Sequence, residues 1–204
     1  MARDRKPIVK QSRREGYALH PKAHKIMLKK PNIPGEHGRS RQPKQSLYAQ
    51  QLREKQKVRR IYGLLERQFA KLMNEASRTK GQSGQVLLQF LEQRLDNAVF
   101  RAGFATSRRG SRQLVSHGHF MLNDRRVDIP SIRVKVGDVI TVREKSRSNT
   151  YFSEVSKTLS DNQQSLSWLK CEPKKMTITI TGVPTREEAE QNINEQLIVE
   201  YYSR

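Results

Sequence analysis

The residues with the clearest chemistry are arginines at the start of a predicted helix. Arg108, Arg109 and Arg112 all fall within its first turns. A helix N-terminus already presents free N–H groups and the positive end of the helix dipole, so arginines there destabilise the isolated helix. A phosphate group can bind both kinds of donor, the backbone amides and the guanidinium groups. The pattern therefore predicts a surface that binds a polyanion.

Further polar residues extend this surface along the helix and into the turn that follows it. An ordinary solvated charged face is the alternative interpretation of such a run. Few acidic residues lie within the helix to balance the arginines, however, and the positive charge is at the unfavourable end of the helix. We therefore interpret these residues as contacts to phosphate. They are Arg108, Arg109, Arg112, Gln113, Ser116, His117, Asn123, Arg125 and Arg126.

Two more basic segments lie nearer the N-terminus. In the first, a predicted helix, Glu54 is the one acidic residue between positions 51 and 60. Its basic residues are Arg53, Lys55, Lys57, Arg59 and Arg60. They favour contact with phosphate, although a basic face that confers solubility is the alternative. The second segment is an N-terminal arm whose basic residues together are typical of a segment that becomes ordered on RNA. They are Arg3, Arg5, Arg13, Arg14, Lys29, Lys30, Arg39 and Arg41.

The composition of the whole chain agrees with a polyanionic partner. There are 40 Lys and Arg residues against 20 Asp and Glu residues, which gives a formal net charge of +20. A domain this basic repels itself unless counter-ions or a polyanion neutralise it. Only 34% of the residues are hydrophobic, so long stretches must be solvated or fold against a partner.

Membranes are the first alternative to nucleic acid as a partner. No apolar run approaches the roughly 20 residues that span a bilayer. The first residues do not form a secretory signal, and no basic helix has a strongly apolar opposite face. The single cysteine, Cys171, excludes an internal disulfide framework and fits a reducing compartment. We therefore expect a cytoplasmic protein that does not bind membranes.

Sequence motifs of enzymes and of metal sites are absent. The chain contains no NTPase phosphate-binding loop, no dinucleotide-binding glycine motif and no metalloprotease or hydrolase signature, so we expect no catalytic residues. His20, His24 and His37 lie in a proline-punctuated arm without cysteines, whereas a zinc site needs ligands in a fixed geometry. We expect no zinc and no cofactor, apart from magnesium ions that accompany RNA.

The kind of nucleic acid follows from what the chain lacks. It has neither zinc-finger spacing nor a basic-region zipper, which are typical of DNA-binding proteins. It also lacks the aromatic-rich sheet on which single-stranded bases stack. The remaining expectation is a protein that recognises folded RNA by its shape and its phosphates.

An arm and a helical domain are predicted to come first along the chain. Residues 1–44 contain prolines at positions 7, 21, 31, 34 and 43, which forbid long helices and predict an extended basic arm. Between residues 45 and 80, apolar residues recur every three or four positions, as in amphipathic helices. Gly63 is expected to divide or bend these helices. The helical domain is assigned to residues 45–94.

The arginine-rich helix belongs to a smaller predicted domain, residues 95–157. One helix is expected over residues 85–102, ending at Gly103. Thr106 or Ser107 can cap the next helix, which is expected to end at Gly118. Apolar residues around an Asn123-Asp124 turn, and around a second turn at positions 137–138, predict short strands. This domain is therefore expected to consist of two helices followed by a small sheet.

The C-terminal segment, residues 158–204, is expected to complete the helical domain. Trp168 is predicted to anchor packing near a turn, and Met176, Ile178 and Ile180 alternate with threonines as in a strand. A capping box at residues 185–188 is expected to open a last helix. This acidic segment is expected to face away from the polyanion. The fold class is α+β, with a mostly helical domain, a small helix-helix-sheet domain and an extended N-terminal arm.

Nearly the whole chain resembles one known protein family. Residues 95–147 resemble the small RNA-binding fold named after bacterial small-subunit ribosomal protein S-four. The motifs Ser12-Arg13-Arg14-Glu15-Gly16 and Pro34-Gly35-Glu36-His37-Gly38, together with the stretches 51–63 and 194–200, resemble the rest of that family. Several independent motifs in the same order make the resemblance specific. Residues 157–183 are the least similar part.

The resemblance implies a structural protein of the small ribosomal subunit. Such proteins bind the 5′ domain of 16S rRNA early, nucleate assembly of the subunit body and contribute to translational accuracy. They also contact ribosomal protein S-five and the mRNA where it enters the subunit. An RNA-modifying enzyme or an RNA chaperone carrying the same small fold is the alternative. The matched RNA-binding positions are Ser12, Arg13, Arg14, His37, Arg53, Lys55, Lys57, Arg59, Arg60, Ser107, Arg108, Arg112, Gln113, His117, Asn123 and Arg126.

The sequence also departs from the family pattern. Many members carry zinc-binding cysteines in the arm, and this chain has none there, so RNA contacts are expected to order the arm. Arg109-Gly110-Ser111 replaces a pattern near Ala-Glu-Ala, which removes an acid and adds a glycine that costs on the order of 1 kcal/mol. From this we expect the helix to depend on RNA. We also expect glutamates at 108 and 112 to leave the free domain as stable or more stable. Asp124 replaces the usual glycine of the turn.

Overall fold

The computed structural model describes residues 4–40, 44–161 and 166–203. The chain forms two compact units. The helical unit comprises residues 1–87 and 192–204, and the sheet unit comprises residues 88–191. Within the described ranges, every helix is too short or too polar to cross a bilayer.

The arm of the helical unit is helical rather than extended. It contains α1 (Ile8–Glu15), α2 (Pro21–Lys29) and a 3₁₀ turn, η1 (Glu36–Arg39). Pro7 takes the N-cap position of α1, and Pro21 is the first residue of α2. At these positions a missing N–H breaks no intrahelical hydrogen bond, so the prolines start helices instead of preventing them. The prediction of an extended arm is therefore wrong for residues 8–29.

The rest of the helical unit is built from α3 (Leu47–Ile61), α4 (Glu66–Arg78), the start of α5 (Ser83–Glu92) and α10 (Glu195–Tyr202). The predicted division at Gly63 is confirmed, because this glycine adopts φ 64° between α3 and α4. Helices α1 and α10 both pack against α3.

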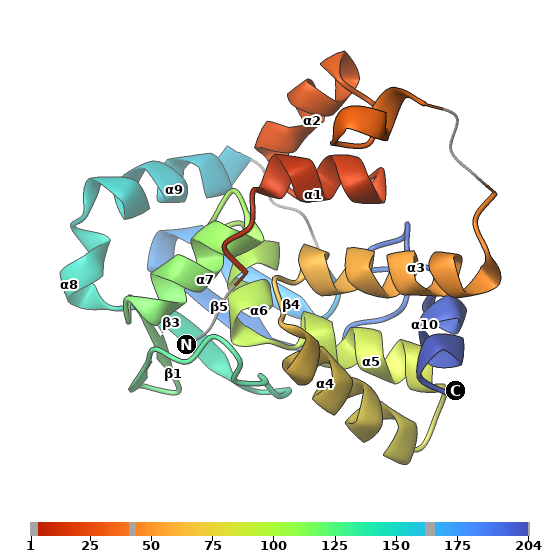
Figure 1. Cartoon of the computed structure of the whole chain (residues 1–204). Coiled ribbons are helices and arrows are strands. Elements are labelled where there is room, and N and C mark those ends of the chain that lie inside the picture. The colour runs from red at the N-terminus through yellow and green to blue at the C-terminus, as the bar shows by residue number, and fades with distance from the viewer. Residues whose placement is uncertain (1–3, 41–43, 162–165, 204) are drawn as a thin grey trace. The chain divides into compact units, whose positions relative to one another are not determined.

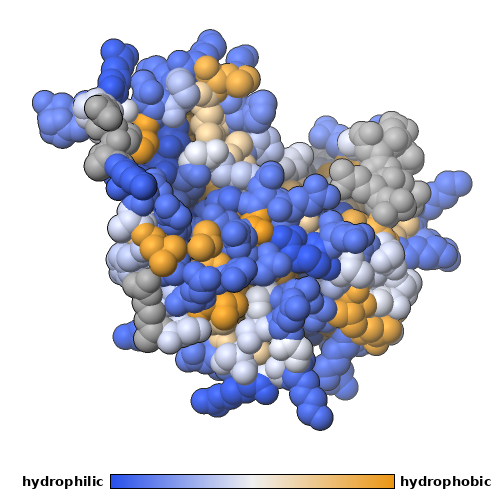
Figure 2. Space-filling model, turned by 90° about the vertical axis from the view of Figure 1, so that its right-hand side faces the viewer, coloured by the Kyte–Doolittle hydropathy of each residue, from blue (hydrophilic) through white to orange (hydrophobic). Residues whose placement is uncertain are grey.

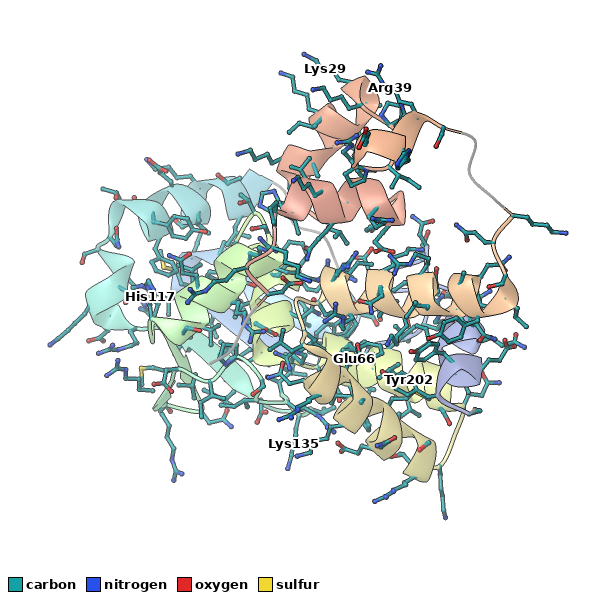
Figure 3. The ribbon with its side chains drawn as sticks, in the orientation of Figure 1. Lys29, Arg39, Glu66, His117, Lys135 and Tyr202 are labelled. Carbon is teal, nitrogen blue, oxygen red and sulfur yellow. The ribbon has the colours of Figure 1, made fainter. Side chains whose placement is uncertain are left out.

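A buried lysine joins α3, α4 and α10. The Lys55 Nζ lies 2.7 Å from a carboxylate oxygen of Glu66 and 4.3 Å from the ring centre of Tyr201. The Tyr202 hydroxyl donates to the same Glu66 oxygen at 2.9 Å, and both residues are labelled in Figure 3. Burial opposes ionisation of Glu66, but the hydrogen bonds from Lys55 and Tyr202 outweigh it and lower its pKa. The C-terminal helix is thus fixed to α3 by a polar cluster.

The sheet unit contains one antiparallel five-stranded sheet in the order β2-β1-β3-β5-β4. Its strands are β1 (Phe120–Leu122), β2 (Arg125–Val127), β3 (Val139–Val142), β4 (Leu169–Glu172) and β5 (Thr177–Ile180). Figure 1 shows α6 (Leu95–Arg101) and α7 (Arg108–Ser116) against one face of this sheet. The unit also contains α8 (Glu144–Arg147), α9 (Thr150–Asp161) and the 3₁₀ turn η2 (Pro173–Lys175).

The core of the sheet unit holds α7 in a fixed position. Val115 of α7 is fully buried, together with Val99 of α6 and Ile140 of β3. Phe120 contacts Phe104 and Phe152 edge-to-face, with ring centres 6.0 and 6.1 Å apart. Such close packing allows little rotation of α7, so its outer face is presented rigidly.

The units divide the chain differently from the sequence-based assignment. Strands β4 and β5 extend the sheet, because Ile178 pairs with Ile140 and Leu169 with Ile180. Trp168 is 1% exposed within this core, as expected for a packing anchor. Residues up to 191 therefore belong to the sheet unit, and only residues 192–204 complete the helical one.

Two predicted helices have other bounds in the structure. The helix predicted over 85–102 breaks at Arg94, because the Leu95 N–H donates to the Ile132 carbonyl and the Val134 N–H donates to the Gln93 carbonyl. These long-range hydrogen bonds take the place of the intrahelical hydrogen bonds that a continuous helix would form. At the predicted capping box, the Thr185 N–H and hydroxyl both donate to the Glu188 carboxylate, but the segment forms only a turn. The last helix begins at Glu195 instead.

Candidate nucleic-acid interface

The N-cap residue Ser107 and the C-terminal Gly118 fix where α7 begins and ends, and so which of its side chains face outward. The Ser107 hydroxyl accepts a hydrogen bond from the Gly110 N–H at 3.2 Å, and Gly118 ends the segment with φ 70°. Both predicted signals are confirmed. Ser111 and Val115 face the core, which leaves an exposed outer face. This outer face consists of Arg109, Gln113, Ser116 and, at the C-cap, His117, which is labelled in Figure 3.

Arg108 and Arg112 point away from this outer face and are engaged by acidic side chains. The Arg108 guanidinium lies 2.7 Å from Glu190 and donates to the Asn97 side chain at 2.8 Å. Arg112 lies 3.4 Å from Asp96, a buried carboxylate. The acids that balance these arginines therefore come from other elements. The expectation of an uncompensated helix is wrong.

The acids of this unit also pair with further arginines. Asp96 also pairs with Arg94 at 2.9 Å, and Glu92 pairs with Arg101 at 2.8 Å. The carboxylates of Asp96 and Glu92 are 7% and 1% exposed. A buried charge that loses its partner is strongly destabilised. Arg108 and Arg112 are thus needed to hold α7 in the fold, and nothing in this arrangement makes the helix depend on RNA.

Loss of the α7 cap is expected to weaken the sheet unit measurably. Ser107→Ala removes the hydroxyl that accepts from Gly110, and such cap losses cost about 1 kcal/mol. Urea unfolding followed by Trp168 fluorescence should show this decrease. The matched control is Ser116→Ala, at the exposed end of the same helix, which we expect to change stability by less than about 0.5 kcal/mol. Equal effects of the two changes would contradict the assignment of the cap.

The β1–β2 hairpin carries two more exposed arginines, and Arg126 lies beside the end of α7. Its Asn123-Asp124 turn has φ values of 48° and 62°, as a type I′ turn requires. Arg125 and Arg126 are exposed on β2. A Cβ atom built on Gly118 would lie 2.8 Å from the Arg126 Nε, so this guanidinium lies next to the residue that ends α7.

We call the resulting set of exposed side chains the α7–hairpin surface. It comprises Arg109, Gln113, Ser116, His117, Arg125 and Arg126. Asn123 is less available, because its side chain donates to Asp138 at 2.9 Å and accepts from the Val139 N–H at 2.9 Å. Asn123 therefore holds the two turns together.

Basic residues next to this surface were missed by the sequence analysis. The Arg143 guanidinium donates to the Gly118 carbonyl at 3.1 Å, and Arg147 donates to the Val142 carbonyl at 3.1 Å. Burial, His117 and Arg143 together lower the pKa of His119, which hydrogen-bonds Ser146 at 3.0 Å. The signal for them was the run of alternating basic residues from 143 to 147.

Two predicted RNA-binding residues of the helical unit are buried. The Ser12 hydroxyl donates to the Ile8 carbonyl at 2.8 Å and accepts from the Leu19 N–H at 3.2 Å. Lys55 is held by Glu66 with a 4% exposed side chain. These side chains stabilise the fold, and RNA could reach them only if these contacts opened. Sequence patterns alone do not distinguish a buried lysine from an exposed one.

The other predicted residues of the helical unit are partly engaged. Arg53 and Arg60 both pair with Glu15, and burial raises the pKa of this carboxyl. Lys57 pairs with Glu54 at 3.1 Å, and the Arg59 guanidinium lies 3.7 Å from Glu66.

The arm residues are more accessible. Arg13 donates to the Asn32 carbonyl at 2.9 Å, and Arg14 and His37 are exposed. Arg3 and Arg41 lie outside the described residues. The face of the molecule in Figure 2 is largely hydrophilic, with hydrophobic residues in small separate groups. Direct RNA contact by any of these residues stays a prediction.

No metal-binding constellation of three or more His, Cys, Asp or Glu side chains occurs in the part of the chain that the structure describes. His20 instead caps α2, where its Nδ1 accepts from the Lys22 N–H at 3.1 Å. The expectation that zinc is not bound stays a prediction.

Comparison with known proteins identifies the relatives of the chain. The family model "Ribosomal protein S4/S9 N-terminal domain" matches residues 3–92, and the model "S4 domain" matches residues 93–140. The small ribosomal subunit protein uS4 of Herpetosiphon aurantiacus is 52% identical over 211 residues. The uS4 proteins of Chloroflexus aurantiacus and Clostridioides difficile are 48% and 47% identical. In all three comparisons the match covers 100% of both chains.

Proposed function

Because this chain belongs to the uS4 family of small ribosomal subunit proteins, we propose that it is a structural constituent of the small ribosomal subunit that binds ribosomal RNA. The observation that carries RNA binding is the α7–hairpin surface. It brings Arg109, Arg125 and Arg126 to an exposed, rigidly supported surface. Such a surface suits the phosphate backbone of a folded RNA.

The binding mode is backbone recognition by a preformed shape. Arginine side chains bind phosphate oxygens with paired N–H donors. Gln113 and Ser116, one turn apart on α7, add neutral donors and acceptors that can reach sugar hydroxyls or phosphates. These contacts fix position and orientation on the RNA, so specificity comes from the fold of the RNA and not from one sequence.

The RNA partner that we propose is the 5′ domain of 16S rRNA. Binding there early in assembly would let the protein nucleate the subunit body and contribute to translational accuracy. Two features support this: motifs of the same family occur in both units, and each unit carries basic residues. Two linked binding modules raise each other's effective concentration at a folded junction. Ribosomal protein S-five and the mRNA where it enters the subunit are the proposed neighbours.

The protein acts as a binder and not as an enzyme. Its relatives are named small ribosomal subunit proteins, and the match covers 100% of both chains. An RNA-modifying enzyme or an RNA chaperone is therefore not favoured. We propose no protein-bound cofactor, only magnesium ions that accompany the RNA, and location in the cytoplasm within the small subunit. Base modification of RNA by the pure protein would reverse this judgement.

Co-sedimentation tests the proposed function. A tagged copy of the chain is expressed in its own cells, and ribosomes are separated on a sucrose gradient after a high-salt wash. We expect about one copy of the chain for each 16S rRNA in the small-subunit fraction. A chain that is absent from washed small subunits would overturn the proposal.

A further inference from the structure

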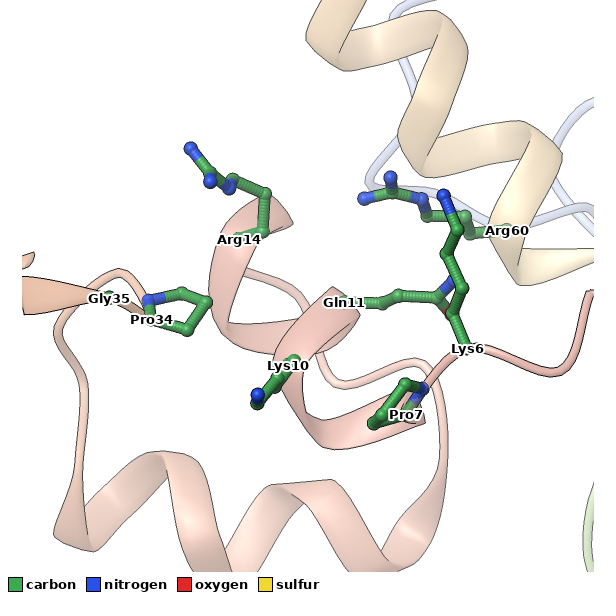
Figure 4. A pocket seen from close by; sticks show the side chains of 8 residues that line it. All are labelled: Lys6, Pro7, Lys10, Gln11, Arg14, Pro34, Gly35 and Arg60. Carbon is green, nitrogen blue, oxygen red and sulfur yellow. The ribbon is translucent and has the colours of Figure 1, made fainter.

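An open cavity of about 340 Å³ lies at the start of α1 in the helical unit. It is formed by three separate segments, namely the start of the arm with α1, the turn at residues 34–35, and the end of α3. Figure 4 shows the side chains that line it. The α7–hairpin surface belongs to the other unit, so this cavity is a separate feature.

Positive charge dominates the lining of the cavity. Among its described lining residues, Lys6, Lys10, Arg14 and Arg60 are basic and none is acidic. In Figure 4 the Lys6 and Arg60 side chains extend in different directions from their two segments and cross in this view. Like charges that line one cavity repel each other unless an anion binds between them.

Two acids next to the cavity are engaged by residues that line it, and Glu15 is also engaged by Arg53. Glu15 pairs with Arg60 and Arg53, and its carboxylate is 1% exposed. Asp4 accepts from the Lys6 N–H at 2.9 Å and from the buried Gln11 amide at 2.7 Å. The Nε of Arg60 is buried without a hydrogen-bond partner among the described residues. A buried donor in this state gains from a ligand that can accept its proton.

The first turn of α1 can add the Lys10 N–H to the same place, because Pro7 has no N–H and the Gln11 N–H donates to the Pro7 carbonyl at 3.1 Å. Pro7, Lys10 and Gln11 line the cavity, so the start of the helix borders it. The N-cap makes no side-chain hydrogen bond, and the first turn carries no acidic residue. Free N–H groups at such a helix start bind phosphate or sulfate well.

We propose that this cavity binds a single phosphate group. The ligand would connect α1, the turn at 34–35 and Arg60 of α3, and would thereby hold the arm against α3. The source of the phosphate is either a free phosphate compound or the backbone of RNA, and both have the chemistry that the cavity requires. The proposal stands independently of the ribosomal assignment, because inorganic phosphate alone tests it.

The test measures protection of α1 in the full-length chain. Hydrogen exchange of the α1 amides is followed while inorganic phosphate is added, with potassium chloride keeping the ionic strength constant. We expect α1 amides to exchange at least tenfold more slowly at saturating phosphate. In the double variant Lys10→Gln, Arg14→Gln, phosphate should bind at least tenfold more weakly.

The matched control is Lys22→Gln, Lys25→Gln, which removes two exposed charges from α2 outside the cavity. We expect it to respond to phosphate as the unchanged chain does. Equal losses in both variants, or equal protection by chloride at the same ionic strength, would overturn the proposal. Adenosine monophosphate and a short RNA are then added as competitors. The competitor that displaces inorganic phosphate at the lower concentration identifies the source of the phosphate group, a free phosphate compound or RNA. If neither competitor displaces inorganic phosphate, the result counts against a phosphate site.

Discussion

The double substitution Arg108→Glu, Arg112→Glu is expected to lower the free energy of unfolding of the sheet unit by about 3–5 kcal/mol. Glutamate at 108 would face Glu190 and Glu92, and glutamate at 112 would face Asp96. Each change removes a partner from a largely buried carboxylate and adds a like charge beside it. The helix dipole favours acids in the first turn by only about 0.3–1 kcal/mol each, so the lost pairs outweigh it.

Trp168 reports this unfolding directly, because it is the single tryptophan and is buried in the sheet unit. Urea titrations should show a lower midpoint for the double variant. The control is Arg125→Glu, Arg126→Glu, which makes the same change in net charge at exposed positions. We expect each of its substitutions to change stability by less than about 0.5 kcal/mol. A double variant at 108 and 112 as stable as the unchanged chain would contradict the structural role of these arginines.

The same control variant is expected to lose RNA binding. Arg125→Glu, Arg126→Glu should weaken binding of a 16S rRNA 5′-domain fragment by about 100-fold at moderate salt, because two phosphate contacts are replaced by repulsion. The slope of log affinity against log salt should fall by about one for each lost contact. Filter binding at several potassium chloride concentrations measures both quantities.

A second charge-matched variant separates specific contact from net charge. Lys170→Glu, Lys174→Glu makes the same charge change at exposed positions in and just after β4. The strands β2 and β4 form opposite edges of the sheet. We expect this variant to retain most of its affinity and nearly all of its salt slope. If both variants lost affinity equally, RNA binding would follow the overall charge and not the α7–hairpin surface.

Local signals explain what the sequence predicted well. The Ser107 cap, the stop at Gly118 and the Asn123-Asp124 turn each depend on a few neighbouring residues. Gly63 separates two helices for the same reason. The arrangement of two helices followed by a hairpin was therefore predictable. So was the exposed position of Arg125, because it directly follows the turn.

Long-range pairing explains what the sequence did not predict. Glu190 reaches Arg108 across 82 positions, and no local pattern indicates such a partner. The break at Arg94 likewise depends on hydrogen bonds with the chain near Ile132. Strand β5 was predicted, but its pairing with β3, which assigns residues up to 191 to the sheet unit, was not. The charge balance of α7 was misjudged because its acids are distant in sequence.

Directed cleavage of rRNA tests most directly whether the α7–hairpin surface binds ribosomal RNA. Burial, together with Glu172, raises the pKa of the Cys171 thiol to about 11, and Cys171→Ser removes it as a competing attachment site. A hydroxyl-radical source is then attached through His117→Cys, on the α7–hairpin surface, or through Glu187→Cys, an exposed position in the acidic segment. Both variants are assembled into small subunits, and cleavage of 16S rRNA is mapped.

The α7–hairpin surface is predicted to face the 5′ domain of 16S rRNA. We expect strong, localised cleavage in that domain from position 117 and at least fivefold weaker cleavage from position 187. Absence of 5′-domain cleavage from position 117, or stronger cleavage from position 187, would contradict the assignment of this surface to RNA.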